Sequence, residues 1–468
     1  MNSIAVIICN YNKKEYVKKC LESLFLQSKK DFDVVVVDNA STDGSAEELS
    51  KLYRNKITLI CNKENLGGSG GFNTGIRRAM EGEYRYLVLL DNDVVLKEDC
   101  IEQLYDDMKK NLNIGIMGTK ILKMDIPDMI QEFAPTVNYE NMTFDLHYSG
   151  DKVDVALPHL KVCDYVPACA LIVRREVIER IGYMPEENFI YYDDITWGVR
   201  CSRAGFEVVA NSMAVVWHKG GAKINPTTFG NYYLTRNKTI FFMRNGDKST
   251  EGCDKAGIDA LTEKILMEIF EGIYSCANND MPNIARTRFD AFLDAILGVK
   301  GKANPLFIRE REYPKKRIEE LCRGKEKILI YMHGKLNETR RILGDIRNLE
   351  ESEGMKYCIE LVSEDSIEVN SIMGYDVQKN SVYENEKYDL ILHICRHIFD
   401  LELEVDEKIW VDGWANVVSN ALDRKVCRGF KDTYKLFRIC FWDRVRESIE
   451  RLTEAEISRY GNQGEVQQ

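Results

Sequence analysis

Two aspartates separated by one residue close an apolar run of strand length. Residues 87–90 are Leu-Val-Leu-Leu, and Asp91-Asn92-Asp93 follows directly. Buried carboxylates without partners destabilise a core, so these acids are poorly suited to one. At the carboxyl edge of a parallel sheet, where ligands bind in open α/β folds, the same pair could hold a divalent cation. A solvated turn after an edge strand is the alternative, because turns with two acids are common.

A second pair of acids, Asp193 and Asp194, opens a segment with helical character that continues to Ala204. The helix dipole favours ionised carboxylates in the first turn, so capping alone could explain the pair. Neighbouring side chains on a helix do not face each other. We therefore expect the two acids to have separate roles.

A histidine, His218, ends the strand-like run of residues 214–217. A lone histidine is usually structural. At a strand end beside acids, however, its neutral imidazole could bind a metal.

Polar side chains also follow the first two predicted strands. Asn10-Tyr11-Asn12 comes after residues 4–9, and Asp38-Asn39 comes after residues 34–37. Both therefore lie at the edge where parallel sheets bind nucleotides. Asp38 could accept a hydrogen bond from a base N–H or a ribose hydroxyl, although it could equally cap the next helix.

A glycine-rich segment, residues 67–75, follows Asn65 and includes Gly70. Such a backbone can approach an anion closely, and the helix expected at 71–80 would favour negative charge at its start. The segment is not a P-loop, because no Lys-Ser/Thr follows the glycines. It follows the third predicted strand rather than the first, so it does not fit a Rossmann dinucleotide fingerprint either.

The first 120 residues alternate strand and helix patterns, which predicts an α/β domain with a mostly parallel sheet. Residues 125–165 are irregular and would suit a lid or an insertion. From about 255 to 325 the pattern is helical, and a second α/β pattern begins near 325. We expect three parts: a main α/β domain at 1–250, a helical connector at 251–324 and a smaller C-terminal α/β domain at 325–468.

The composition excludes several classes of protein. The formal net charge is -11, whereas a general nucleic-acid binder carries a basic surplus. We interpret local basic clusters such as Lys13-Lys14 as solvated helix faces. The cysteines, 14 in number, form no CxxC pair, which indicates a reducing cytoplasm and neither a disulfide framework nor a zinc site. No apolar run approaches the ~20 residues that cross a bilayer, and no signal peptide precedes the first strand. We expect a cytoplasmic protein, attached at most to the inner face of the cell membrane.

The order of these motifs over residues 3–245 resembles that of family 2 glycosyltransferases with the GT-A fold. Within that family, the glycine-rich segment, YYDDITWGVR at 191–200 and VVWHKGG at 215–221 look most like galactofuranosyltransferases that extend cell-surface glycans. Rhamnosyltransferases look similar. Residues 232–237 also resemble a segment that often follows the histidine in such enzymes.

The resemblance implies a role for each motif at the nucleotide-sugar donor. Asp38 would bind the nucleobase with Asn10 beside it, and Asp91 would contact the ribose side. Asp93 and His218 would hold Mg²⁺ or Mn²⁺ against the diphosphate. The other residues expected at the donor site are Asn12, Asn65, Gly70 and Asn92.

The resemblance also implies acceptor chemistry. Asp194 would be the general base, and Asp193 would orient the acceptor or the loop. Trp197 and Trp217 would stack on sugar faces, although core packing is the simpler role for either one.

The expected function is therefore inverting, metal-dependent transfer of a hexose, with galactofuranose favoured, to a cell-wall polysaccharide or lipid-linked glycan. Rhamnosyl transfer from dTDP-rhamnose is the alternative, and a non-catalytic scaffold that binds nucleotide sugars is a more distant one. A nucleotidyltransferase would carry a basic, glycine-rich signature after the first strand, where Asn10-Tyr11-Asn12 stands instead.

The C-terminal part carries no phosphate loop. We expect it to serve docking, homo-oligomerisation or contact with a membrane surface. Its last helix, predicted around residues 430–459, mixes aromatic and apolar side chains with many charges, which suits subunit packing or a membrane surface. The alternative is that this helix simply closes its own domain.

Overall fold

The computed structural model describes residues 3–220, 227–246, 255–312, 317–363, 371–379, 387–401 and 408–461. The chain forms two compact units, residues 1–225 with 299–304 and residues 226–298 with 305–468. The helical segment and the C-terminal α/β segment, which the sequence suggested as separate parts, thus belong to one unit.

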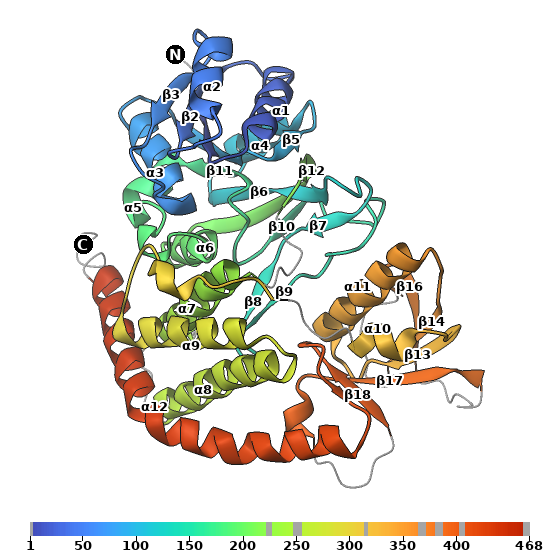
Figure 1. Cartoon of the computed structure of the whole chain (residues 1–468). Coiled ribbons are helices and arrows are strands. Elements are labelled where there is room, and N and C mark those ends of the chain that lie inside the picture. The colour runs from blue at the N-terminus through green and yellow to red at the C-terminus, as the bar shows by residue number, and fades with distance from the viewer. Residues whose placement is uncertain are drawn as a thin grey trace. The chain divides into compact units, whose positions relative to one another are not determined.

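The first unit alternates strands and helices along the chain (Figure 1). Its elements are β1 (Ile4–Asn10), α1 (Lys14–Phe25), β2 (Phe32–Asp38), α2 (Ser45–Tyr53), β3 (Thr58–Cys61), α3 (Gly67–Met80), β4 (Tyr86–Asp91), β5 (Val94–Leu96), α4 (Cys100–Lys110), β6 (Ile114–Lys123), β7 (Ile130–Glu132), β8 (Thr136–Asn138), β9 (Thr143–Asp145), β10 (Leu160–Val162), β11 (Ala170–Arg174), α5 (Arg175–Ile181), η1 (Glu186–Asn188), α6 (Asp193–Arg203) and β12 (Glu207–His218).

One sheet organises this unit, with strand order β10-β12-β6-β11-β4-β1-β2-β3. Strand β1 pairs in parallel with both β2 and β4, and β2 pairs in parallel with β3. The chain therefore moves to one side of β1 for β2 and β3 and crosses to the other side for β4. Ligands of open α/β sheets bind where the strand order reverses in this way. Strand β11 runs antiparallel to both neighbours, so the sheet is mixed, and the predicted α/β class is confirmed.

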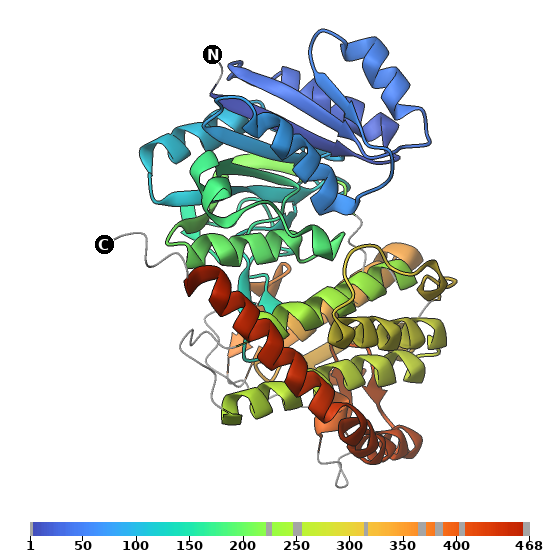
Figure 2. The same cartoon turned by 90° about the vertical axis from the view of Figure 1, so that its left-hand side faces the viewer.

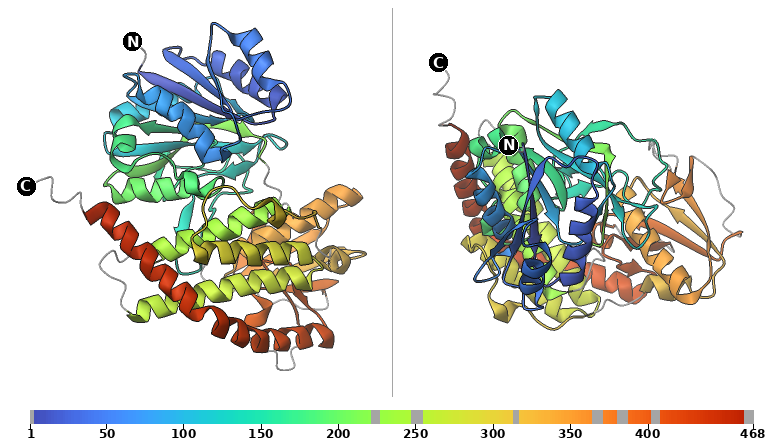
Figure 3. Two further views of the ribbon diagram at one scale, coloured as in Figure 1. Left: turned by 60° about the vertical axis from the view of Figure 1, so that its left-hand side comes forward. Right: turned by 90° about the horizontal axis from the view of Figure 1, so that it is seen from above.

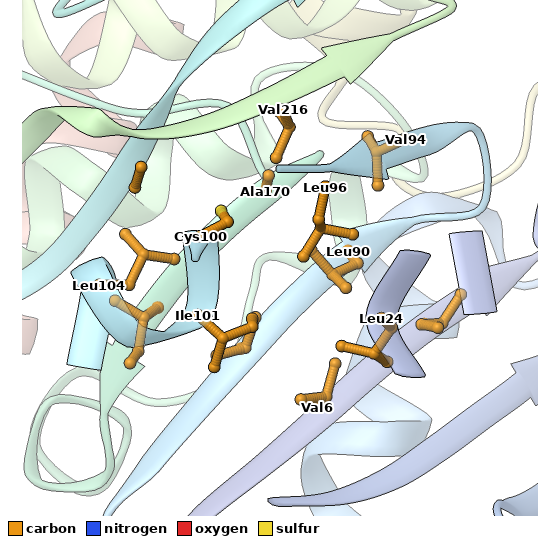
Figure 4. Close-up of a cluster of buried hydrophobic side chains, with 14 of the residues drawn as sticks. Val6, Leu24, Leu90, Val94, Leu96, Cys100, Ile101, Leu104, Ala170 and Val216 are labelled. Carbon is orange, nitrogen blue, oxygen red and sulfur yellow. The ribbon is translucent and has the colours of Figure 1, made fainter. Parts of the chain in front are cut away.

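Each face of the sheet is covered by a separate hydrophobic core. Leu21 and Leu24 of α1 and Leu104 of α4 pack on one face, against strand residues such as Val6. Figure 4 shows this cluster, in which Leu24, Val6 and Leu90 lie together. Helices α3, α5 and α6 cover the other face. Valine and isoleucine make up most of β1 and β2, which suits strands buried on both sides.

Two element predictions need correction. The strand-like run at 214–217 is only the last part of a longer strand, β12, whose register with β6 shifts between Asn211 and Val215. The glycine-rich segment is not a loop before a helix at 71, because α3 already begins at Gly67. Its glycines serve close packing: a Cβ at Gly75 would lie 2.4 Å from Ile7 Cγ2 of β1.

A strained turn precedes α6. Phe189, Tyr191 and Tyr192 have φ values of 67°, 64° and 65°, which non-glycine residues rarely adopt. The start of α3 packs directly against this turn, because a Cβ on Gly67 would lie 2.0 Å from the Phe189 carbonyl oxygen. Gly67 itself has a φ of 77°. The glycine thus allows a backbone contact that fixes where α6 begins.

The second unit combines a helical bundle with a seven-stranded sheet of order β15-β16-β14-β13-β17-β18-β19. Helix α12 packs on α7, α8 and α9 (Figures 2 and 3) and is longer than predicted. The elements are α7 (Thr228–Asn245), α8 (Lys255–Asn278), α9 (Pro282–Leu297), η2 (Pro305–Phe307), α10 (Arg317–Cys322), β13 (Lys327–Tyr331), α11 (Leu336–Glu353), β14 (Cys358–Ser363), β15 (Ser371–Ile372), β16 (Tyr375–Lys379), β17 (Leu390–Cys395), η4 (Ile398–Asp400), β18 (Ile409–Asp412), β19 (Val417–Val418) and α12 (Ala421–Gly461).

Among the described helices of both units, none is long and apolar enough to cross a bilayer. The cysteines within the described ranges are all free.

The contact between Gly67 and the turn before α6 gives a test of the fold. We expect Gly67→Ala to lower the free energy of unfolding by about 2 kcal/mol or more, since it adds both backbone strain and overpacking. Denaturant unfolding followed by circular dichroism measures this loss. Gly68→Ala is the matched control, because its Cβ would meet only Asp193 Oδ2 at 3.8 Å, and we expect a change within ~1 kcal/mol. Equal stability of the two variants would contradict the packing described.

Candidate functional site

Asp91, Asp93 and His218 come together at the carboxyl edge of the first sheet. Asp91 ends β4, and the antiparallel pairing of β5 with β12 places Val94 opposite His218. His218 Nε2 lies 3.3 Å from Asp93 Oδ1 and 3.7 Å from Asp91 Oδ2. Ligand atoms of all three residues lie within 4.8 Å of one another. Carboxylate oxygens and an imidazole nitrogen are a donor set that suits Mn²⁺ and related divalent metals.

Two residues that the sequence did not single out complete this cluster. Lys13 Nζ lies 2.5 Å from Asp93 Oδ2, so Lys13 is not part of a merely solvated helix face as we had interpreted it. Gln131 Nε2 lies 3.1 Å from His218 Nδ1 and orients the ring. Burial alone would raise the pKa of Asp93, but the hydrogen bonds and charges of His218 and Lys13 lower it. Asp93 is therefore ionised at neutral pH.

A row of hydrogen-bonded polar side chains crosses the same edge. Asn92 Nδ2 donates to Asn10 Oδ1 at 2.9 Å, and Asn10 Nδ2 donates to Asp38 Oδ1 at 3.1 Å. The second oxygen of Asp38 accepts from the Ser41 amide at 2.9 Å. All three side chains are buried. The row fixes the ends of β1, β2 and β4 relative to one another.

Asn12 and Asn65 lie beside this row and hold loop backbone. Asn12 Oδ1 accepts from the Thr42 amide at 2.7 Å. Asn65 Oδ1 accepts from the Gly67 amide at 2.8 Å and from Asn39 Nδ2 at 3.1 Å. Gly70 is buried within α3, where a Cβ would lie 2.6 Å from Leu66 Cβ. These contacts stabilise the fold. That Asn12, Asn65 and Gly70 also contact the nucleotide-sugar donor stays a prediction.

Asp193 and Asp194 begin α6 immediately after the strained turn, and their carboxyl groups have different surroundings. Asp193 is only 8% exposed, and a Cβ on Gly68 would lie 3.8 Å from its Oδ2. Asp194 is half-buried, and its two oxygens accept from the amides of Ala168 at 3.2 Å and Ile195 at 2.8 Å. Separate surroundings agree with the expectation of separate roles.

The charges of these acids raise one another's pKa values. Burial, followed by the charges of Asp194 and Asp91, raises the pKa of Asp193. Burial, followed by the charges of Asp91, Asp38 and Asp193, raises the pKa of the Cys9 thiol. Cys9 precedes Asn10 near the carboxyl end of β1.

Glu132 is a further acid that sequence reasoning missed. Burial and the charge of Asp194 raise its pKa to about 8. It lies on the short strand β7, next to Gln131, inside the segment predicted only as an irregular insertion. No sequence motif includes Glu132. It reaches the site because β7 folds back and pairs with β6.

The two tryptophans lie in different places. Trp197 is completely buried in the core between α6 and the sheet, and its Nε1 donates to the Gly182 carbonyl at 3.0 Å. The prediction that it contacts a sugar is therefore wrong in this structure, because no part of its ring reaches the surface. Trp217 is partly buried, with Nε1 donating to the Pro127 carbonyl at 3.2 Å. Its sugar contact stays a prediction.

The sequence is similar to that of known proteins. Residues 5–181 match the family model described as "Glycosyl transferase family 2". Low-salt glycan biosynthesis hexosyltransferase Agl10 of Haloferax volcanii is 28% identical over 213 residues, which cover 44% of this chain and 64% of that protein. Galactofuranosyltransferase GlfT2 of Mycolicibacterium smegmatis is 21% identical over 272 residues, which cover 51% and 42% respectively.

A solved structure, the mannosyltransferase PcManGT from Pyrobaculum calidifontis in complex with GDP-Man and Mn²⁺, aligns with a TM-score of 0.39 and 16% identity. The alignment covers 63% of this chain and 75% of that one. At that TM-score the likeness carries no inference about this chain. The observed sheet confirms the predicted α/β fold class, and residues 5–181 match the family 2 glycosyltransferase model.

Proposed function

We propose that the chain is an inverting, metal-dependent glycosyltransferase. It moves a hexose from a nucleotide-diphosphate sugar to a hydroxyl of a cell-surface polysaccharide or a lipid-linked glycan. The observation that carries the proposal is the cluster of Asp91, Asp93 and His218 beside Asp193 and Asp194 at one sheet edge. The family match over residues 5–181 supports the class of reaction.

The donor half of the site follows from the topology. The nucleoside would lie across the ends of β1 and β2, where Asp38 closes the row of polar side chains. The diphosphate would lie toward Asp91 and Asp93, whose cluster with His218 would hold Mn²⁺ or Mg²⁺. A bound divalent cation would stabilise the negative charge that accumulates on the leaving diphosphate. Lys13 adds a further positive charge beside Asp93.

The acceptor half uses the start of α6. Asp194 would remove the proton from the acceptor hydroxyl while that oxygen attacks the anomeric carbon. Burial raises the pKa of Asp194, which makes it a better base once it is ionised, and backbone hydrogen bonds oppose the shift. A single displacement of this kind inverts the anomeric centre. Asp193, buried against the glycine-rich start of α3, would position the turn rather than take the proton.

Galactofuranose is the donor sugar we favour, and dTDP-rhamnose is the alternative. The motifs around the glycine-rich segment, residues 191–200 and His218 support the first choice, as does the similarity to a protein named galactofuranosyltransferase. The similarity to a protein named hexosyltransferase supports hexose transfer in general. In either case the same residues hold the same roles.

Replacing the proposed base should separate chemistry from binding. We expect Asp194→Asn to lower kcat by about 10²-fold or more, because the amide cannot accept the acceptor proton. Donor affinity should change less than about threefold, since Asp194 does not belong to the metal cluster. Transfer assays and donor titrations with UDP-galactofuranose and dTDP-rhamnose measure both. Asp106→Asn, on the exposed side of α4, is the control, and unchanged turnover in Asp194→Asn would remove the base assignment.

Replacing a metal ligand should change metal binding itself. We expect Asp93→Asn to weaken Mn²⁺ binding at least about tenfold, because it removes an ionised ligand without changing the shape of the side chain. Electron paramagnetic resonance counts free Mn²⁺ during a titration and needs no turnover. Asp106→Asn should bind Mn²⁺ as the unaltered chain does. A normal titration in Asp93→Asn would argue against the metal site.

A further inference from the structure

The outer face of α12 carries large apolar side chains that are exposed to solvent. Ile439 is 74% exposed and Leu436 is 66% exposed, and Cys440 beside them is exposed too. Leu297, at the end of α9, is 64% exposed. It lines one groove together with Cys440 and Arg444. Contiguous exposed apolar surface of this kind marks interaction sites.

The charges on α12 are antisymmetric about Ile439. We compared the two residues that lie the same number of positions before and after Ile439. For each charged residue between 424 and 454, the residue at the matching position is either oppositely charged or uncharged. The opposite-charge pairs are Lys435 with Asp443, Asp432 with Arg446, Lys431 with Glu447, Arg428 with Glu450, and Arg424 with Glu454. No position pairs with a like charge.

Several of these residues share the face that Ile439 exposes. Positions 432, 435, 439, 443 and 446 follow the three-to-four spacing of one helix face. Lys435 and Asp432 are 73% and 83% exposed. Asp443 is exposed as well. Two such helices in antiparallel orientation, related by a twofold axis at Ile439, would therefore bring Lys435 of each opposite Asp443 of the other.

We propose that this face of α12 is an isologous interface with a second copy of the chain. The twofold axis passes through Ile439, and Leu436, Ile439 and Cys440 form the apolar centre. A twofold interface is self-complementary by necessity, and antisymmetry about one residue is the pattern that such pairing requires. An unrelated partner would not demand it. An anionic membrane surface is disfavoured, because Asp432 and Asp443 would face it beside the apolar centre.

The pairs nearest the axis should contribute most. Helix α12 curves around α7, α8 and α9, with those helices on its inner side (Figure 1). Two α12 helices that meet on these convex outer sides move apart with distance from the twofold axis, because each helix curves away from the other. Lys435 and Asp443 each lie only ~6 Å along the helix from Ile439. Arg446 already contacts Asp259 at 3.1 Å and Glu450 at 3.0 Å, so its pair with Asp432 is secondary.

Charge reversal tests the proposed register. Sedimentation velocity of the full chain over a range of concentrations should show a reversible dimer. Lys435→Glu and Asp443→Lys should each raise the dimer dissociation constant about tenfold, because the twofold axis turns one reversal into two repulsive contacts. The double variant should restore the original constant. A chain that stays monomeric up to ~100 μM, or a double variant that stays as weak as the single ones, would overturn the proposal.

Disulfide trapping provides a second readout that a folding defect cannot imitate. In a Cys440→Ser background, Ile439→Cys should give a covalent dimer on mild oxidation, because the two thiols meet at the axis. Leu422→Cys, 70% exposed on the same helix, should not. Equal crosslinking of the Ile439→Cys and Leu422→Cys variants would contradict the position of the twofold axis. If the chain forms no dimer but sediments with phosphatidylglycerol vesicles, and Ile439→Glu abolishes this binding, then the face binds a membrane surface and the proposal is overturned.

Discussion

Repulsion among carboxylates is the constraint on which the site depends. Asp91, Asp93, Asp193, Asp194 and Glu132 lie close enough that burial and mutual charge raise the pKa of several of them. Among the contacts described there, Lys13 places a positive charge beside Asp93, and His218 adds one only when it is protonated. Like charges held together in a partly buried site favour either protonation or a bound cation. The arrangement therefore favours a divalent metal at the edge where the acids meet.

Close backbone packing holds these acids in place. Gly67 lets the start of α3 contact the Phe189 carbonyl, and the turn that follows carries three residues in the left-handed region. Such strain persists only where surrounding structure over-determines it. Asp193 and Asp194 are then presented at the first turn of α6, opposite the strand ends that carry Asp91 and Asp93. The strand ends and the start of α6 thus form one site, because Gly67 has no Cβ that would keep α3 away from the turn before α6.

Much of this arrangement could be predicted from the sequence, because strand periodicity and acids at strand ends are local signals. Asp91, Asp93 and His218 were predicted at one edge, and the structure brings them together. Glu132 and Gln131 could not be predicted, since only the fold of β7 against β6 places them there. For Trp197 the simpler of the two expected roles, core packing, is the observed one, although its neighbours along the chain do not reveal that α6 turns this ring into the core. The glycines at 71 and 75 indicated an anion loop, whereas close helix-to-strand packing is what requires them.

Thermal unfolding with a panel of UDP-, dTDP- and GDP-sugars, each with and without Mn²⁺, tests the central claim most directly. A ligand that binds only the folded state raises Tm by mass action. We expect UDP-galactofuranose to raise Tm only in the presence of Mn²⁺. A preference for dTDP-rhamnose would keep the site and change the donor. A folded chain that responds to no nucleotide sugar in the presence of Mn²⁺ would contradict the account.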